Sequence, residues 1–120
     1  MAKILIVEDE PVLAEMYKEK IKNAGFQVNS ASSTEEAIDS LKKEKPDLIL
    51  LDILLPRENG ICFLKKLRKI KKFYETPVIV VSNYDNSETK KESFKLGVKA
   101  YLIKTQYTPK QLLEEIKKFL

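Results

Sequence analysis

Histidine is absent from the sequence, and cysteine occurs only once, as Cys62. Without histidine the chain cannot build a Ser-His or Cys-His nucleophile, and a single cysteine excludes an internal disulfide. A zinc site made from histidine and cysteine is excluded as well. Any metal bound by this chain must therefore be a hard cation held by oxygen atoms.

Long hydrophobic runs are also missing. No apolar stretch approaches the roughly 20 residues of a membrane-spanning helix, and the first residues lack the apolar centre and cleavage site of a secretory leader. We therefore expect a cytoplasmic protein that makes no membrane contact. The 120 residues contain no linker or repeat, so residues 1–120 are expected to form one domain without an attached output domain.

The excess of charge of one sign is small, because 22 basic and 18 acidic residues give a net charge of +4. Most of this excess lies in Lys65–Lys72, where Leu64, Leu67 and Ile70 recur at helical spacing. The pattern predicts an amphipathic helix whose basic residues face water. No aromatic residues separate the basic ones, so we expect no direct binding to nucleic acid.

Three segments are continuously apolar, as is typical of strands covered on both faces: Lys3–Val7, Leu48–Leu51 and Pro77–Val81. Phe26–Ala31 alternates apolar and polar residues, which indicates an edge strand, and Val98–Ile103 can occupy the other edge. Helices between successive strands make the sheet parallel, with right-handed crossovers. We predict an α/β, flavodoxin-like (βα)5 fold, doubly wound around a five-stranded sheet of order 2-1-3-4-5.

Five helices are predicted from capping and helix-ending residues. Pro11 suits the start of the first helix and Gly25 its end, and the third helix is expected from Gly60 to Phe73. Capping pairs are expected at Ser33 with Glu36, at Asp85 with Glu88 and at Thr108 with Gln111. The residues expected to face the core are Leu13, Met16, Tyr17, Ile21 and Ala24, then Ala37, Ile38 and Leu41, then Phe94, and finally Leu112, Leu113, Ile116 and Phe119.

Polar residues directly follow four of the strands: Glu8 and Asp9, Asp52, Ser82 and Lys104. Because the carboxyl ends of parallel strands meet at one edge of the sheet, these five side chains are expected to converge there. Neighbouring carboxylates repel one another and favour a bound cation, and Mg²⁺ fits better than Ca²⁺, which needs more oxygen ligands. The alternative is structural: the acids complement a helix dipole, and Lys104 only pairs with Asp52.

Together these residues resemble the receiver domains of two-component response regulators, whose best-known single-domain member is the chemotaxis regulator. The resemblance covers essentially the whole chain and rests on Glu8 and Asp9, Asp52 to Pro56, Asn59 and Gly60, Ser82, Tyr101 and Lys104. It implies a signalling domain, not an enzyme in the ordinary sense. Asp52 would accept a phosphoryl group from the phosphohistidine of a histidine kinase or of a histidine phosphotransfer protein.

The resemblance also implies Mg²⁺ as the cofactor. Asp9 and Asp52 would ligate the ion directly, Glu8 would act mainly through water, and the carbonyl of Leu54 would supply a third protein oxygen. The ion would span carboxylate and phosphoryl oxygens.

Lys104 and Ser82 would, by the same resemblance, each bind a phosphoryl oxygen. Movement of the Ser82 hydroxyl towards the phosphate would free space into which Tyr101 turns. The two residues would thereby change the face made by the fourth helix, fifth strand and fifth helix, which would bind a downstream target protein.

Three other functions share parts of this pattern. A flavodoxin-like flavin binder would hold a phosphate where Glu8, Asp9 and Glu10 would repel it. A phosphatase with an aspartate nucleophile would need a second acid at the position of Leu54. A phosphorylation-independent adaptor that retains the receiver fold is the remaining alternative.

The chain departs from the family at two loop positions. Asn83 follows Ser82 where a small residue is common, and Thr105 follows Lys104 where the family usually has proline. A cis peptide bond before threonine costs about 3 to 4 kcal/mol, against under 1 kcal/mol before proline. We therefore predict a trans bond before Thr105.

Overall fold

The computed structural model describes residues 1–120 as five parallel strands in the order β2-β1-β3-β4-β5, as predicted. The strands are β1 (Lys3–Val7), β2 (Gln27–Ala31), β3 (Leu48–Leu51), β4 (Val78–Ser82) and β5 (Ala100–Ile103). The helices are α1 (Pro11–Asn23), α2 (Thr34–Lys43), α3 (Gly60–Lys69), α4 (Ser87–Lys95) and α5 (Pro109–Lys117), with a 3₁₀ turn at Lys104–Gln106. The α/β, flavodoxin-like prediction is thus confirmed.

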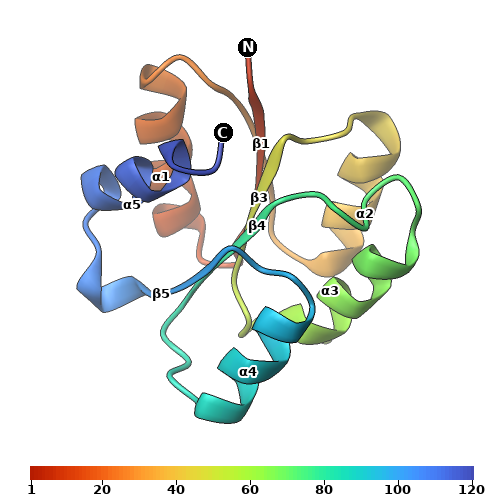
Figure 1. The fold of residues 1–120 in the computed structure, drawn as a ribbon. Coiled ribbons are helices and arrows are strands. Elements are labelled where there is room, and N and C mark those ends of the chain that lie inside the picture. The colour runs from red at the N-terminus through yellow and green to blue at the C-terminus, as the bar shows by residue number, and fades with distance from the viewer.

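Helices cover both faces of the sheet. Figure 1 shows α1 and α5 on one side and α2, α3 and α4 on the other. Alternate residues of each central strand enter the two cores: Leu48 and Leu50 pack with α1 and α5, whereas Ile49 and Leu51 pack with α2 and α3. This is why the strand has to be apolar at every position.

The helix caps follow the predicted chemistry with two exceptions. Thr108 and Gln111 form the predicted reciprocal capping box of α5. The Ser33 hydroxyl accepts the N–H of Glu36, but the Glu36 carboxylate binds the N–H and hydroxyl of Ser32, so the box at α2 is only half formed.

The second exception is α4, where the prediction of an Asp85 cap is wrong. The side chain of Asn86 accepts the N–H of Thr89, while Asp85 forms an ion pair with Lys90. Asn86 lies three residues before the N–H that it caps, which is the spacing that an N-cap requires.

Three residues that we expected in the core are more exposed than predicted. Met16 and Phe94 are 47% and 51% exposed, and Ala24 is also exposed, at the C-cap of α1. The only buried residue of α4 is Ser93, so its neighbour Phe94 points outward. Helix α3 ends at Lys69 rather than Phe73, so Ile70 leaves the apolar stripe and is 39% exposed.

Arg68 also departs from the prediction that the basic residues of Lys65–Lys72 face water. Its guanidinium donates hydrogen bonds to the carbonyl oxygens of Leu96 at 2.7 Å, Thr76 at 2.8 Å and Phe73 at 3.1 Å. It therefore joins the end of α4 to the loop between α3 and β4. None of the helices combines the length and the apolar character needed to cross a membrane.

Candidate functional site

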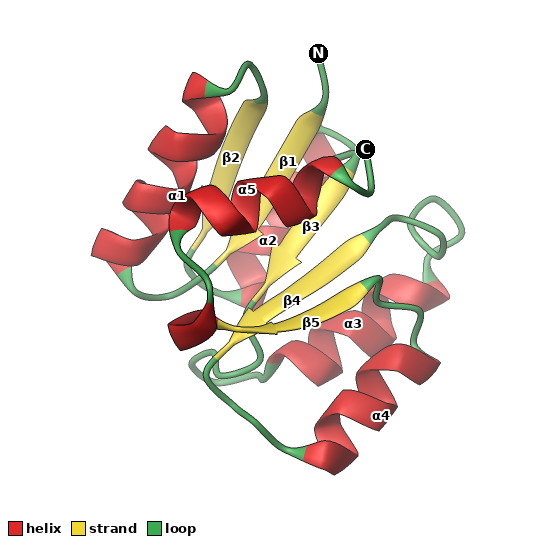
Figure 2. Cartoon of the chain, turned by 60° about the vertical axis from the view of Figure 1, so that its left-hand side comes forward, coloured by secondary structure: helices red, strands yellow, loops and turns green.

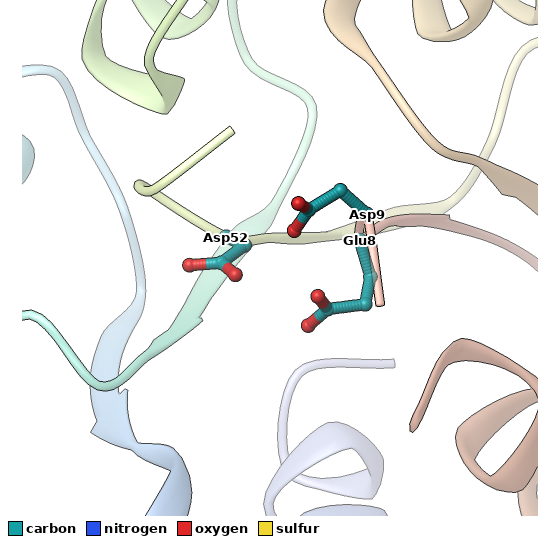
Figure 3. A group of neighbouring side chains, drawn as sticks. All are labelled: Glu8, Asp9 and Asp52. Atoms are coloured by element: carbon teal, nitrogen blue, oxygen red, sulfur yellow. The ribbon is translucent and has the colours of Figure 1, made fainter. Parts of the chain in front are cut away.

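The acidic residues are brought together by strand register. Val7 pairs with Leu51 at the ends of β1 and β3, so the residues that follow these strands lie side by side. The N–H of Asp52 donates to the carbonyl of Val7 at 3.0 Å, which fixes its backbone. Figure 3 shows the carboxylates of Glu8, Asp9 and Asp52 gathered at this edge, with that of Asp9 directed towards Asp52.

Three carboxylates form one cluster at this edge. Each of Glu8, Asp9 and Asp52 offers an oxygen within 4.8 Å of those of the other two. Glu8 and Asp52 are each only 4% exposed, whereas Asp9 is exposed. The prediction that the acids converge is therefore met in the geometry.

Lys104 lies between two of these acids. Its Nζ is 2.7 Å from Glu8 Oε1 and 2.7 Å from Asp52 Oδ2. Burial alone would lower the pKa of Lys104, but its hydrogen bonds and the two negative charges raise that pKa above the ordinary value. The chain has no cis peptide bond, so the bond before Thr105 is trans, as predicted, and Lys104 reaches the acids from a 3₁₀ turn.

Two opposing effects act on the pKa of Glu8. Burial raises its pKa, the hydrogen bond from Lys104 lowers it, and the net result is a raised pKa. A second contact holds the side chain, because the N–H of Glu10 donates to Glu8 Oε2 at 3.1 Å. Burial of the Glu8 carboxylate therefore outweighs the stabilisation that Lys104 gives to its charged form.

Ser82 and Tyr101 both contact the backbone of Tyr84. The fully buried Ser82 hydroxyl accepts the N–H of Tyr84 at 3.2 Å, and the Tyr101 hydroxyl donates to the carbonyl of Tyr84 at 2.5 Å. Lys90 lies 5.8 Å from the centre of the Tyr101 ring. The sequence predicted roles for Ser82 and Tyr101 but not that both would bind the backbone of Tyr84. Every residue has the same backbone atoms, so the sequence carries no sign of such a contact.

The loop after β3 controls the position of Asp52. The N–H of Leu54 donates to Asp52 Oδ1 at 3.2 Å, and the N–H of Gly60 donates to the carbonyl of Ile53 at 2.8 Å. A Cβ atom at Gly60 would collide with the carbonyl oxygen of Asp52. The sequence indicated a turn at Asn59 and Gly60, but only the structure shows that the site itself requires glycine here.

The donor set suits a hard divalent cation. Glu8, Asp9 and Asp52 offer only oxygen atoms, and Lys104 supplies a single positive charge against three carboxylates. Mg²⁺ takes such oxygen ligands and retains several waters, so a partly open cluster on which only Asp9 is exposed fits its needs.

Comparison with known proteins agrees with this geometry. Residues 4–117 match the response regulator receiver domain family. The chain is a receiver domain. Receiver domains are signalling domains of two-component systems and typically bind Mg²⁺ at their acidic pocket.

One curated relative of this receiver domain is a transcriptional regulatory protein. The domain is 33% identical over 118 residues to the alkaline phosphatase synthesis transcriptional regulatory protein PhoP of Bacillus subtilis, covering 98% of this chain and 48% of PhoP. The chain therefore spans about half the length of that curated relative.

Two solved structures show the same fold over nearly their whole length. The chemotaxis protein CheY4 of Vibrio cholerae has a TM-score of 0.92 at 28% identity, covering 100% of this chain and 99% of CheY4. The receiver domain of Francisella response regulator 1452 has a TM-score of 0.87 at 30% identity, covering 99% of this chain and 96% of that one.

Proposed function

We propose that this receiver domain accepts a phosphoryl group on Asp52 from the phosphohistidine of a histidine kinase or a histidine phosphotransfer protein. The observation that carries the proposal is a buried carboxylate at a strand end, with the Lys104 ammonium 2.7 Å away and two further acids beside it. An Asp52 oxygen would attack the phosphorus as the bond to the histidine nitrogen breaks, and that nitrogen would leave with the electron pair.

The residues around Asp52 have separate tasks in this reaction. Lys104 would transfer one of its hydrogen bonds from a carboxylate to a phosphoryl oxygen and neutralise charge there. The Ser82 hydroxyl accepts from Tyr84, which leaves its own O–H free to donate to a second phosphoryl oxygen. Asp9 and Asp52 would hold Mg²⁺ directly, with Glu8 through water and the Leu54 carbonyl as a further oxygen. The bound ion would stabilise charge on the phosphoryl oxygens.

A movement of the Ser82 side chain would affect Tyr101 through the backbone of Tyr84. Ser82 and Tyr101 bind the N–H and the carbonyl of this one residue, so a shift of the Ser82 hydroxyl would alter the support of the Tyr101 ring. Tyr101 lies on β5, beside α4, and we propose that α4, β5 and α5 form the face that binds a downstream protein. We also propose that residues 1–120 are one receiver domain that signals through this contact, in the cytoplasm and without binding nucleic acid directly.

Acetyl phosphate with Mg²⁺ tests the acceptor residue. Intact mass spectrometry should show the gain of one phosphoryl group in the wild type and none in Asp52→Asn. Lys104→Met should fold but gain the group much more slowly. Equal labelling of Asp52→Asn would contradict the assignment.

A second experiment separates this function from that of a phosphorylation-independent adaptor. Proteins captured from the source cells on the immobilised domain would be compared with and without beryllofluoride, a phosphoryl mimic. A phosphorylation switch predicts a partner whose capture depends on the mimic and is insensitive to it in Asp52→Asn. Identical capture in all samples would favour the adaptor.

A further inference from the structure

The edge of the sheet opposite Asp52 carries a groove. The residues that precede β3, β4 and β5 meet at this amino edge, which lies at the opposite end of the strands from the arrowheads in Figure 2. Two hollows open there, of about 350 Å³ and about 620 Å³, and Tyr74 and Glu75 line both. The two hollows adjoin at these residues, and we call the surface that includes both the amino-edge groove.

Five lysines line the amino-edge groove: Lys45, Lys71, Lys72, Lys95 and Lys99. None of the five forms an ion pair, which is also true of nine lysines elsewhere in the chain, so what distinguishes the groove is that five lysines are gathered in it. The acids on the groove wall are Asp47 and Glu75, and Asp47 already accepts the N–H of Lys3 at 2.7 Å.

Helix dipoles account for only part of this positive charge. Helices α2, α3 and α4 end close to these lysines in sequence, and a helix C-terminus favours a nearby cation. Each helix end carries roughly half a negative charge, which falls short of the charge of five lysines and is partly screened by water. The groove therefore has a surplus of positive charge that the chain does not use.

Two uncharged side chains, Thr76 and Tyr74, also line the amino-edge groove. Thr76 is 4% exposed, and its hydroxyl oxygen is buried without any hydrogen-bond partner. Tyr74, which lies between the two hollows, is 53% exposed and offers an aromatic surface.

We propose that the amino-edge groove binds an acidic segment of a partner protein. Carboxylates of the segment would pair with the lysines, and its apolar side chains would pack on Tyr74. Single-stranded nucleic acid is a poorer fit, because it uses several aromatic platforms in succession and the groove has one. The groove is separated from Asp52 by the length of β3, roughly 13 Å for four residues, so binding does not require phosphorylation of Asp52.

Fluorescence anisotropy with a labelled octaglutamate peptide tests the proposal. The wild type should bind the peptide, more weakly as salt is added. A triple variant with Lys45→Gln, Lys72→Gln and Lys99→Gln should bind about tenfold more weakly or worse, since three ion pairs are lost. The matched control carries Lys22→Gln, Lys110→Gln and Lys117→Gln, which removes the same charge from α1 and α5 and should change the Kd less than about twofold.

Three outcomes would overturn the inference. Equal losses in the two triple variants would mean that only net charge attracts the peptide. Absence of binding at low salt would remove the site, and tighter binding of an oligothymidylate than of the peptide would assign the groove to nucleic acid. Asp52→Asn should bind like the wild type, so the result is independent of whether Asp52 is phosphorylated.

Discussion

Replacing Lys104 by methionine tests the central electrostatic argument. The variant removes the only cation from between Glu8 and Asp52, which are each 4% exposed. At 4.8 Å and an effective dielectric constant of 20, two carboxylates repel by about 3.5 kcal/mol. Removing one partner of a buried ion pair costs about 3 to 5 kcal/mol. We therefore expect the free energy of unfolding without metal to fall by about 3 to 5 kcal/mol.

Urea unfolding followed by circular dichroism measures this loss, first with EDTA and then with Mg²⁺. Mg²⁺ should stabilise Lys104→Met more than the wild type, because the variant has more repulsion to relieve. The loss should shrink as the pH falls through the pKa of Glu8, whose protonation removes one of the two charges. Lys118→Met, at an exposed lysine, serves as a control and should change stability by less than about 0.5 kcal/mol. A Lys104→Met protein as stable as this control in EDTA would refute the reasoning.

Three further predictions concern other residues. Arg68→Met should lower the free energy of unfolding by about 2 to 4 kcal/mol, because it removes charged hydrogen bonds to several carbonyls; exposed Lys69→Met should have little effect. Gly60→Ala should destabilise the domain by about 1 to 3 kcal/mol and slow labelling by acetyl phosphate, since the methyl group would push against the Asp52 carbonyl; fast labelling would contradict this. Burial and the nearby charges of Asp52 and Asp85 raise the pKa of Tyr101 to about 12, so an alkaline absorbance titration should show late-titrating phenols. Tyr101→Phe should remove one of them and leave that of Tyr17, whose pKa burial also raises. Stability from Tyr101 should be complete below pH 10, the ordinary tyrosine pKa, and lost as the pH rises through about 12.

The fold could be predicted because the sequence repeats one physical rule. Continuous apolar runs such as Leu48–Leu51 can only be strands covered on both faces, and the helices between them impose a parallel sheet. The same rule predicted that Glu8, Asp9 and Asp52 would meet, since they follow strands that end at one edge. Side-chain type and strand order were sufficient for these inferences.

Contacts made by the ends of helices were harder to predict. From helical spacing we predicted that Phe94 would lie in the core and that Arg68 would face water like the lysines around it. Both errors arise because α4 is short and contributes a single buried residue, Ser93, so its position depends on what holds its end. That contact is made by Arg68 to the backbone carbonyl of Leu96, and a carbonyl is present at every position of every sequence.

Backbone atoms also explain why the two edges of the sheet differ in how far the sequence predicts them. At the carboxyl edge the acids, Ser82 and Lys104 are side chains at or just after the end of a strand, so residue type predicts where they lie. The amino-edge groove instead combines the loops that precede three strands. In the sequence its lysines are typical of the solvent-exposed ends of helices, and only the fold shows that they lie together. Residue type thus predicts the acids at the carboxyl edge, whereas the gathering of lysines at the amino edge is visible only once folding brings the three loops together.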